Sequence, residues 1–162
     1  MIERKYVKKI ILLCRDFINE IPMSCGTNKC SSCCCNNCDC NHGYFKGSKL
    51  SQRIFFLFKD EIKKVLNKRD SVNWKGFLNP KKGCMLPLHI RSIICLSYVG
   101  YSEEETLYCY PKKFKHIVKI YTSLLRKAEN DFDKYRNIYS TFNYDMLTDL
   151  ISLAKKINKK KG

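Results

Sequence analysis

Seven cysteines lie within sixteen residues, between Cys25 and Cys40, in the run C-G-T-N-K-C-S-S-C-C-C-N-N-C-D-C. Two more, Cys84 and Cys95, flank a short motif further along the chain. Thiolates at such spacing are typical ligands of a soft or borderline metal ion. The segment 23–49, which holds the first seven, is rich in Cys, Asn, Ser and Gly and has almost no apolar side chains. Because so long a loop is unusual in a compact domain unless something ties it down, we expect a bound metal to staple it.

Disulfides are the alternative use of these cysteines, and the sequence argues against them. The chain has 11 cysteines, an odd number, and Cys33, Cys34 and Cys35 are contiguous, which is poor geometry for separate bridges. The N-terminal segment has an apolar run only from Ile10 to Cys14, unlike a signal peptide. Nothing in the sequence approaches the roughly 20 apolar residues of a membrane span. We therefore expect a cytoplasmic protein with reduced thiols and no membrane span.

The chain is strongly basic, with a formal net charge of +16 over 162 residues. Such a charge favours nucleic acid, an anionic membrane surface or an acidic protein as a partner. In the run Tyr110-Pro-Lys-Lys-Phe-Lys115, lysines alternate with aromatic residues, a pattern that favours nucleic acid. Lysine is also the default surface residue of proteins encoded by AT-rich genomes, so the charge has a second explanation. From the sequence, both interpretations stay open.

Apolar side chains recur at helical spacing in four segments, and no segment alternates as a β-strand would. We expect a first helix over 3–21, ended by Pro22, and a second over 50–68, capped by Ser51. The third is a long amphipathic helix that begins near Pro111.

The fourth helix is expected to begin near Thr141 or Asn143. These four segments predict an all-α fold, a small helical domain with a Cys-rich, metal-stapled loop. With no internal repeat, we expect 1–162 to form a single domain. Its parts are the Cys-rich loop 23–49, the second cysteine motif 84–98 and the C-terminal helices 111–159.

The apolar stripes of the helices indicate which residues should form the core. Cys14 lies on the first stripe, so we interpret it as a packed core residue and not as a ligand. The expected core residues are Val7, Ile10, Ile11, Cys14, Ile18 and Ile21; Ile54, Phe58, Ile62, Val65 and Leu66; Phe114, Ile117, Val118, Tyr121, Leu124, Leu125, Ala128, Phe132 and Tyr135; and Met146, Leu147, Leu150, Ile151, Ala154 and Ile157. Between the helices, we expect a turn at 79–83, a short helix or turn at 88–99 and a helical turn from Ser102.

Spacing within the cysteine-rich loop is dense enough for one closed metal site or more. A structural zinc site takes four Cys or His ligands, and iron–sulfur clusters also use cysteine thiolates. Cys30-x2-Cys33 has the familiar two-residue spacing, and Cys35-x2-Cys38 repeats it. Cys25, Cys40 and His42 add further candidate ligands, so either some thiols are spare or more than one ion binds.

Two motifs resemble the YkgJ-type cysteine-cluster family, known as zinc- or iron-chelating domains. Cys30-Ser-Ser-Cys33-Cys34 is similar to the second half of that family's CxxCxxCC motif. Downstream, Cys84 is followed by Arg91, Cys95 and Tyr98 in the register of the family's R-P-x-x-C-x-x-[FY] signature. The chain departs from the pattern, with Thr27 at the first cysteine, Ser92 at the proline and Gly100 at a cysteine that some members carry. The resemblance implies a ligand set of Cys30, Cys33, Cys34, Cys84 and Cys95, and zinc or iron as the metal.

On function, the sequence favours a cytoplasmic metal-binding cysteine-cluster protein. One relative in the family, flagellin lysine-N-methylase, is an enzyme, but this chain shows no phosphate-binding, dinucleotide-binding, zincin or nucleophile-elbow motif. Neither His89 nor His116 is nominated as a catalytic base, and His116 is expected at the surface. Two alternatives remain: a basic, zinc-stapled nucleic-acid-binding module, and a metallothionein-like metal buffer that uses the loop and dispenses with Cys84 and Cys95.

Overall fold

The computed structural model describes residues 2–22, 48–68, 78–79, 83–84, 86–87, 89 and 110–160. In these ranges the protein is an all-α structure, as the sequence predicts. The helices are α1 (Ile2–Glu20), α3 (Lys49–Leu57), α4 (Lys59–Asn67), α6 (Lys115–Tyr135) and α7 (Tyr144–Lys159), with 3-10 turns η3 (Lys112–Phe114) and η4 (Ile138–Ser140). The described residues also include two short strands, β1 (Leu78–Asn79) and β2 (Gly83–Cys84), which pair antiparallel.

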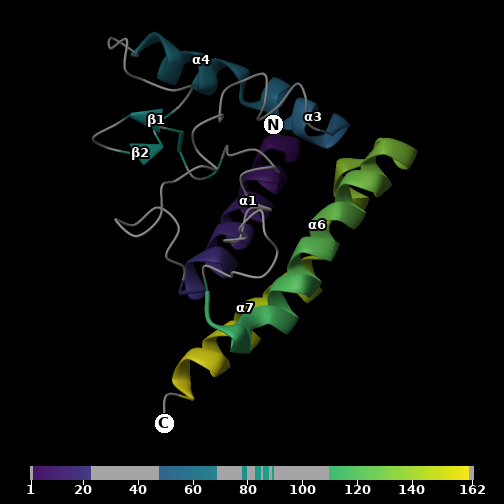
Figure 1. Cartoon of the computed structure of the whole chain (residues 1–162). Helices are drawn as coiled ribbons and strands as arrows, with labels where there is room; N and C mark the ends of the chain where they lie inside the picture. The colour runs from purple at the N-terminus through teal and green to yellow at the C-terminus, as the bar shows by residue number, and fades with distance from the viewer. Residues whose placement is uncertain are drawn as a thin grey trace.

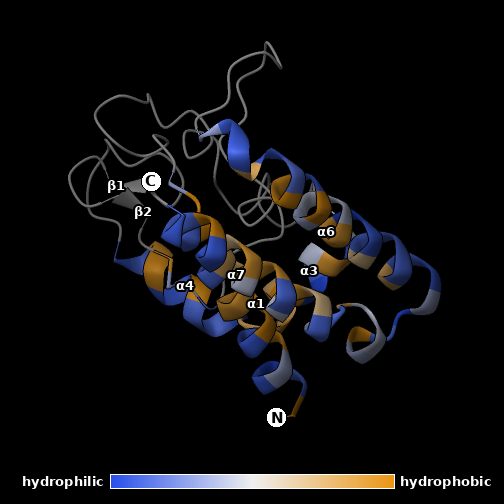
Figure 2. Ribbon diagram, turned by 90° about the horizontal axis from the view of Figure 1, so that it is seen from below, coloured by the Kyte–Doolittle hydropathy of each residue, from blue (hydrophilic) through white to orange (hydrophobic). Residues whose placement is uncertain are grey.

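The helices pack around α1 (Figure 1). α6 and α7 run along one side of it, with α7 packed directly against α1, while α3 and α4 lie across its N-terminal end. α6 also contacts α3. Buried residues of α1, α3, α4, α6 and α7 form one hydrophobic core. Each helix has an apolar and a polar face (Figure 2), as expected for helices that bury only one side.

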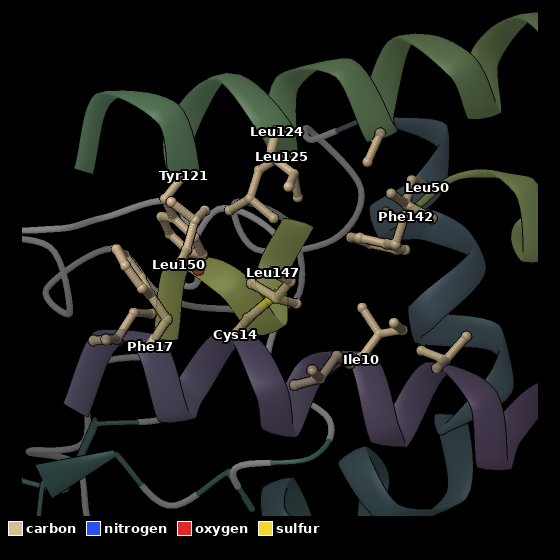
Figure 3. Packing of buried hydrophobic residues seen from close by; sticks show 14 of the residues in the cluster. Ile10, Cys14, Phe17, Leu50, Tyr121, Leu124, Leu125, Phe142, Leu147 and Leu150 are labelled. Atoms are coloured by element: carbon tan, nitrogen blue, oxygen red, sulfur yellow. The ribbon is translucent and has the colours of Figure 1, made fainter. Parts of the chain in front are cut away.

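The centre of the core lies between α1 and α6. Ile10, Cys14 and Phe17 of α1 point toward α6, and Leu147 and Leu150 of α7 fill the space beside them (Figure 3). The Phe17 ring stacks on Tyr121 of α6 with 4.4 Å between centroids. An aromatic pair of this kind contributes about 0.5–1.5 kcal/mol beyond the area that it buries. Residues from both ends of the chain thus hold the bundle together.

The second predicted helix is in fact two helices, so the expectation of one continuous helix over 50–68 was wrong. The break is at Phe58, whose backbone (φ −117°, ψ 21°) leaves the helical region. Its amide donates to the carbonyls of both Ile54 and Phe55, and its side chain is almost completely buried. The change of direction therefore lets Phe58 reach the core while α4 starts on a new axis.

The cap of α3 is also one turn earlier than expected. Ser48, not Ser51, is the N-cap: its hydroxyl oxygen accepts a hydrogen bond from the amide of Ser51. Ser51 itself is completely buried. At the start of α7, the second of the two expected positions is correct, because the Asn143 side chain accepts a hydrogen bond from the amide of Met146.

Two residues expected in the core are exposed instead. Tyr135 is 60% exposed because α6 ends there, with Arg136 in the left-handed conformation (φ 55°) as its C-cap. Met146 is 42% exposed because it lies in the first turn of α7, on the flank of the buried stripe. Val65, Leu66, Ile151 and Ile157 pack against the core but are only partly buried. The other expected core residues are buried.

Candidate metal centre

The predicted ligands fall mostly outside the described residues. Cys84 is in β2, where its backbone pairs with Leu78. Outside the described ranges lie Cys30, Cys33, Cys34 and Cys95, the further candidates Cys25, Cys35, Cys38, Cys40 and His42, and the turns expected near 88–99 and 102–105. Within the described ranges, no three His, Cys, Asp or Glu side chains form a group that could hold a metal ion. The ligand set implied by the resemblance stays a prediction.

Cys14 is a core residue, as the sequence indicates. Its thiol is free and has no exposed surface. Burial raises its pKa from 9.0 to about 12, and a hydrogen bond with Tyr121 opposes that rise only in part. Because the thiolate is the form that binds metal, a thiol that stays protonated in the core is not a ligand.

The second cysteine motif begins at Cys84, in a strand that pairs with β1. The antiparallel pairing of β1 with β2 places Asn79 opposite Gly83 and Leu78 opposite Cys84, which agrees with the turn expected at 79–83, although residues 80–82 lie outside the described ranges. Two residues after Cys84, the Leu86 side chain is 4% exposed and belongs to the core. Leu86 therefore ties the chain to the helical core just after Cys84.

A second anchor follows at His89, which is part of a 3-10 turn. Its Nε2 is 2.9 Å from Oε2 of Glu61 on α4, and its ring meets the ring of Phe58 edge-on, with 6.1 Å between centroids. Arg4 of α1 donates from Nη2 to the other carboxylate oxygen of Glu61 at 2.6 Å. The Arg4 guanidinium also lies over the Phe58 ring, 5.4 Å from its centroid. Helices α1 and α4 and the second cysteine motif thus meet at Glu61.

Charge explains how Glu61 is held in its ionised form. Burial by itself raises the pKa of this carboxyl, but the hydrogen bond and charge of His89, together with Arg4, lower it below its ordinary value. Arg4 and Glu61 are 43% and 32% exposed, and exposed ion pairs contribute little to stability, about 0–1 kcal/mol. The main consequence of the cluster is therefore geometric: it orients the His89 ring against α4.

The pairing of His89 with Glu61 was not predicted from the sequence. The residue lies between Cys84 and Cys95, which was a signal, but its partner Glu61 is 28 residues away in the chain. Glu61 lies in the first turn of a charged helix, where a carboxylate is ordinary because it complements the helix dipole. A pairing between residues so distant in the chain depends on the tertiary packing, which helical periodicity does not specify. His116, in contrast, is exposed on α6, as expected.

The structure also corrects the interpretation of the basic, aromatic run at 110–115. Tyr110 and Phe114 are buried, 5% and 0% exposed, so their rings are core residues and not a stacking surface. Three exposed tyrosine rings lie elsewhere, around the connection between α6 and α7. Tyr135, Tyr139 and Tyr144 are 60%, 49% and 40% exposed, and we call these three the tyrosine patch.

Lysines accompany the tyrosine patch. The Lys9 ammonium of α1 lies 4.7 Å from the ring centroid of Tyr144, and that of Lys134 lies 5.1 Å from the centroid of Tyr135. Tyr6 of α1 packs on Tyr139, with 5.1 Å between centroids, which ties the patch to the first helix. Cations and exposed rings thus occur together on this end of the bundle.

Searches of protein-family models, of curated proteins and of solved structures found no match to this chain. Among the helices of the described residues, none has the length and apolar character needed to cross a membrane.

Proposed function

We propose that this protein binds zinc or iron, the latter as an ion or an iron–sulfur cluster, through cysteine thiolates of two segments. The proposed ligands are Cys30, Cys33 and Cys34 from the loop and Cys84 and Cys95 from the second motif. The observation that carries the proposal is the density of cysteines between residues 25 and 40. A reducing cytoplasm is the compartment that suits eleven cysteines of this arrangement.

The packing around the second motif supports a structural purpose for such a metal. In this motif, Leu86 is buried in the helical core and His89 contacts Glu61 of α4. A metal shared between this fixed segment and the loop near residue 30 would close a long stretch of chain. Closing it removes conformational entropy from the unfolded state and makes metal affinity part of the folding free energy.

The test is metal content after purification without oxygen, for the wild type and the Cys84→Ser/Cys95→Ser double variant. Near-stoichiometric zinc, or iron with inorganic sulfide and a visible charge-transfer band, is expected in the wild type and lost in the double variant. Cys14→Ser is the matched control, because it removes a buried thiol that is not a ligand and should leave metal content unchanged. A folded wild type that takes up no metal contradicts the proposal.

The same measurement separates the metal-buffer alternative. A metallothionein-like protein would bind several equivalents of Cu(I) or zinc through the loop. Its metal content would then survive the double substitution of Cys84 and Cys95.

Nucleic-acid binding is the second candidate function, and the tyrosine patch is the observation that favours it. Exposed rings beside lysines are how proteins bind single strands, since each base stacks on an aromatic ring and contributes about 1–3 kcal/mol. A net charge of +16 adds long-range attraction to phosphates. Lys9 and Lys134, beside the tyrosine patch, would contact the phosphate backbone of the nucleic acid, and Tyr139 and Tyr144 would stack on its bases.

Fluorescence anisotropy with a random single-stranded oligonucleotide tests this candidate. Affinity should fall steeply with salt and should fall at least about fivefold in Tyr139→Ala, the loss of about 1 kcal/mol. Lys63→Ala on α4, away from the patch, is the control, and it should change affinity far less. Indifference to the oligonucleotide at low salt would remove the candidate and leave an acidic protein as the partner to seek.

A further inference from the structure

The imidazole of His89 is held in one orientation by groups from two helices. Oε2 of Glu61 lies 2.9 Å from Nε2 of His89, and the Phe58 ring meets the imidazole edge-on. Glu61 is itself fixed, because Arg4 binds its second oxygen at 2.6 Å. Across the part of the chain that the structure describes, Nδ1 of His89 has no hydrogen-bond partner.

This arrangement has a well-defined chemical meaning. A carboxylate that accepts from Nε2 holds the proton on that nitrogen and leaves a lone pair on Nδ1. Histidines that bind metal almost always donate their other ring nitrogen to a carboxylate, a carbonyl or a water, which fixes the ring and raises its basicity. The Arg4–Glu61–His89 chain thus supplies the outer half of a carboxylate–histidine–metal triad.

The position of His89 in the sequence places it within reach of the proposed ligands. It follows Cys84 by five residues and precedes Cys95 by six. Five residues span at most about 17 Å when fully extended. Leu86, between Cys84 and His89, is buried in the core. Cys84 and His89 are thus close neighbours along the chain, as ligands of one metal ion commonly are.

We propose that His89 is a ligand of the same metal, through Nδ1, and that Glu61, held by Arg4, positions its ring. The inference rests on the proposed metal-binding function and deepens it. It gives the site a mixed sulfur and nitrogen ligand set, in which a tetrahedral zinc ion would take one imidazole and three of the five proposed thiolates. His89 is then a metal ligand, while Glu61 and Arg4 are positioning residues.

A direct test uses the wild-type protein loaded with cadmium-113 and labelled with nitrogen-15 at histidine. Scalar coupling between the bound cadmium and Nδ1 of His89 is the expected result. A cadmium signal without coupling to this nitrogen overturns the proposal. Since no substitution is made, the answer does not depend on whether a variant folds.

Competition titrations with cobalt(II) test the positioning role. His89→Ala and Glu61→Gln should each weaken cobalt binding about 10–100-fold, the usual cost of losing such a partner. The cobalt spectrum of His89→Ala should also change, because the nitrogen donor is lost. Glu3→Gln is the matched control: it removes a carboxylate that likewise joins α1 to a neighbouring helix, through Arg53 at 2.6 Å, but has no histidine.

The outcomes separate this inference from the function on which it rests. Unchanged affinity and spectrum in His89→Ala, with metal still lost in the Cys84→Ser/Cys95→Ser variant, would reject His89 as a ligand and keep the cysteine centre. An effect of Glu3→Gln equal to that of Glu61→Gln would reject the specific role of Glu61. A wild type that binds neither cadmium nor cobalt would reject both proposals together.

Discussion

The Cys14 thiol gives a prediction whose size follows from its burial. Cys14→Ala removes one sulfur atom from a side chain with no exposed surface, next to Tyr121. The lost transfer energy and the small cavity should lower the free energy of unfolding by about 1–2 kcal/mol near pH 7. Equilibrium unfolding in guanidinium chloride, followed by circular dichroism, measures this difference.

The difference should then shrink as the pH rises. The folded state raises the pKa of Cys14 from 9.0 to about 12, so the stabilisation is complete below pH 9 and is lost toward pH 12. In that window the wild type loses up to about 1.4 kcal/mol per pH unit from this group, whereas the variant loses nothing. The two stabilities should therefore meet between about pH 9.6 and 10.5. Other titrating groups cancel in the comparison.

A gap that stays constant between pH 8 and 10.5 would refute the reasoning, because it would mean that the thiol ionises equally well in both states. Alkylation gives an independent check on the tryptic peptide 10–15, which contains only this cysteine. A pKa raised from 9.0 to about 12 lowers the thiolate fraction about a thousandfold. Cys14 should therefore react at the rate at which the protein unfolds.

Three further predictions concern stability, and thermal or chemical unfolding measures each of them. Asn143→Ala removes the side-chain cap of α7 and should cost about 1 kcal/mol, and an unchanged stability would argue against the cap. Leu150→Ala should cost about 2–5 kcal/mol because its side chain is 2% exposed, whereas Leu153→Ala on the same helix, 43% exposed, should cost about 0.5 kcal/mol or less. Equal losses would contradict the orientation of α7. Arg53→Ala breaks the pair with Glu3 and should cost less than about 1 kcal/mol, with an effect that vanishes at high salt.

The helices that periodicity identifies are those whose apolar stripe faces one continuous core. Val7 to Ile18 in α1 and Phe114 to Phe132 in α6 repeat at helical spacing, and both stripes are buried in the core that these helices share with α3 and α7. Their ends are less predictable. Tyr135 fits the stripe of α6 by spacing, but the left-handed Arg136 ends the helix before the ring reaches any neighbour.

The break at Phe58 shows a different limit of sequence reasoning. Neither Pro nor Gly marks the place, and the apolar spacing continues across it. The helix changes direction because α4 must cross the end of α1, where Arg4 meets both Phe58 and Glu61. Such a cause lies in the tertiary packing and leaves no local signal.

For the candidate site, cysteine spacing indicates which residues to propose as metal ligands, but it does not reveal what would orient them. The Glu61–His89 pair joins residues that are distant in sequence, and neither residue type is unusual where it stands. Cys14 is the converse case, since its place on an apolar stripe was enough to exclude it from the ligands. Sequence patterns thus separate core thiols from candidate ligands better than they identify the groups around a site.

X-ray absorption at the edge of the bound metal, on protein purified without oxygen, identifies the atoms that bind it. We expect mainly sulfur neighbours, at about 2.3 Å if the metal is zinc. A first shell of oxygen and nitrogen alone, with no sulfur, would contradict the proposal that the cysteines bind the metal.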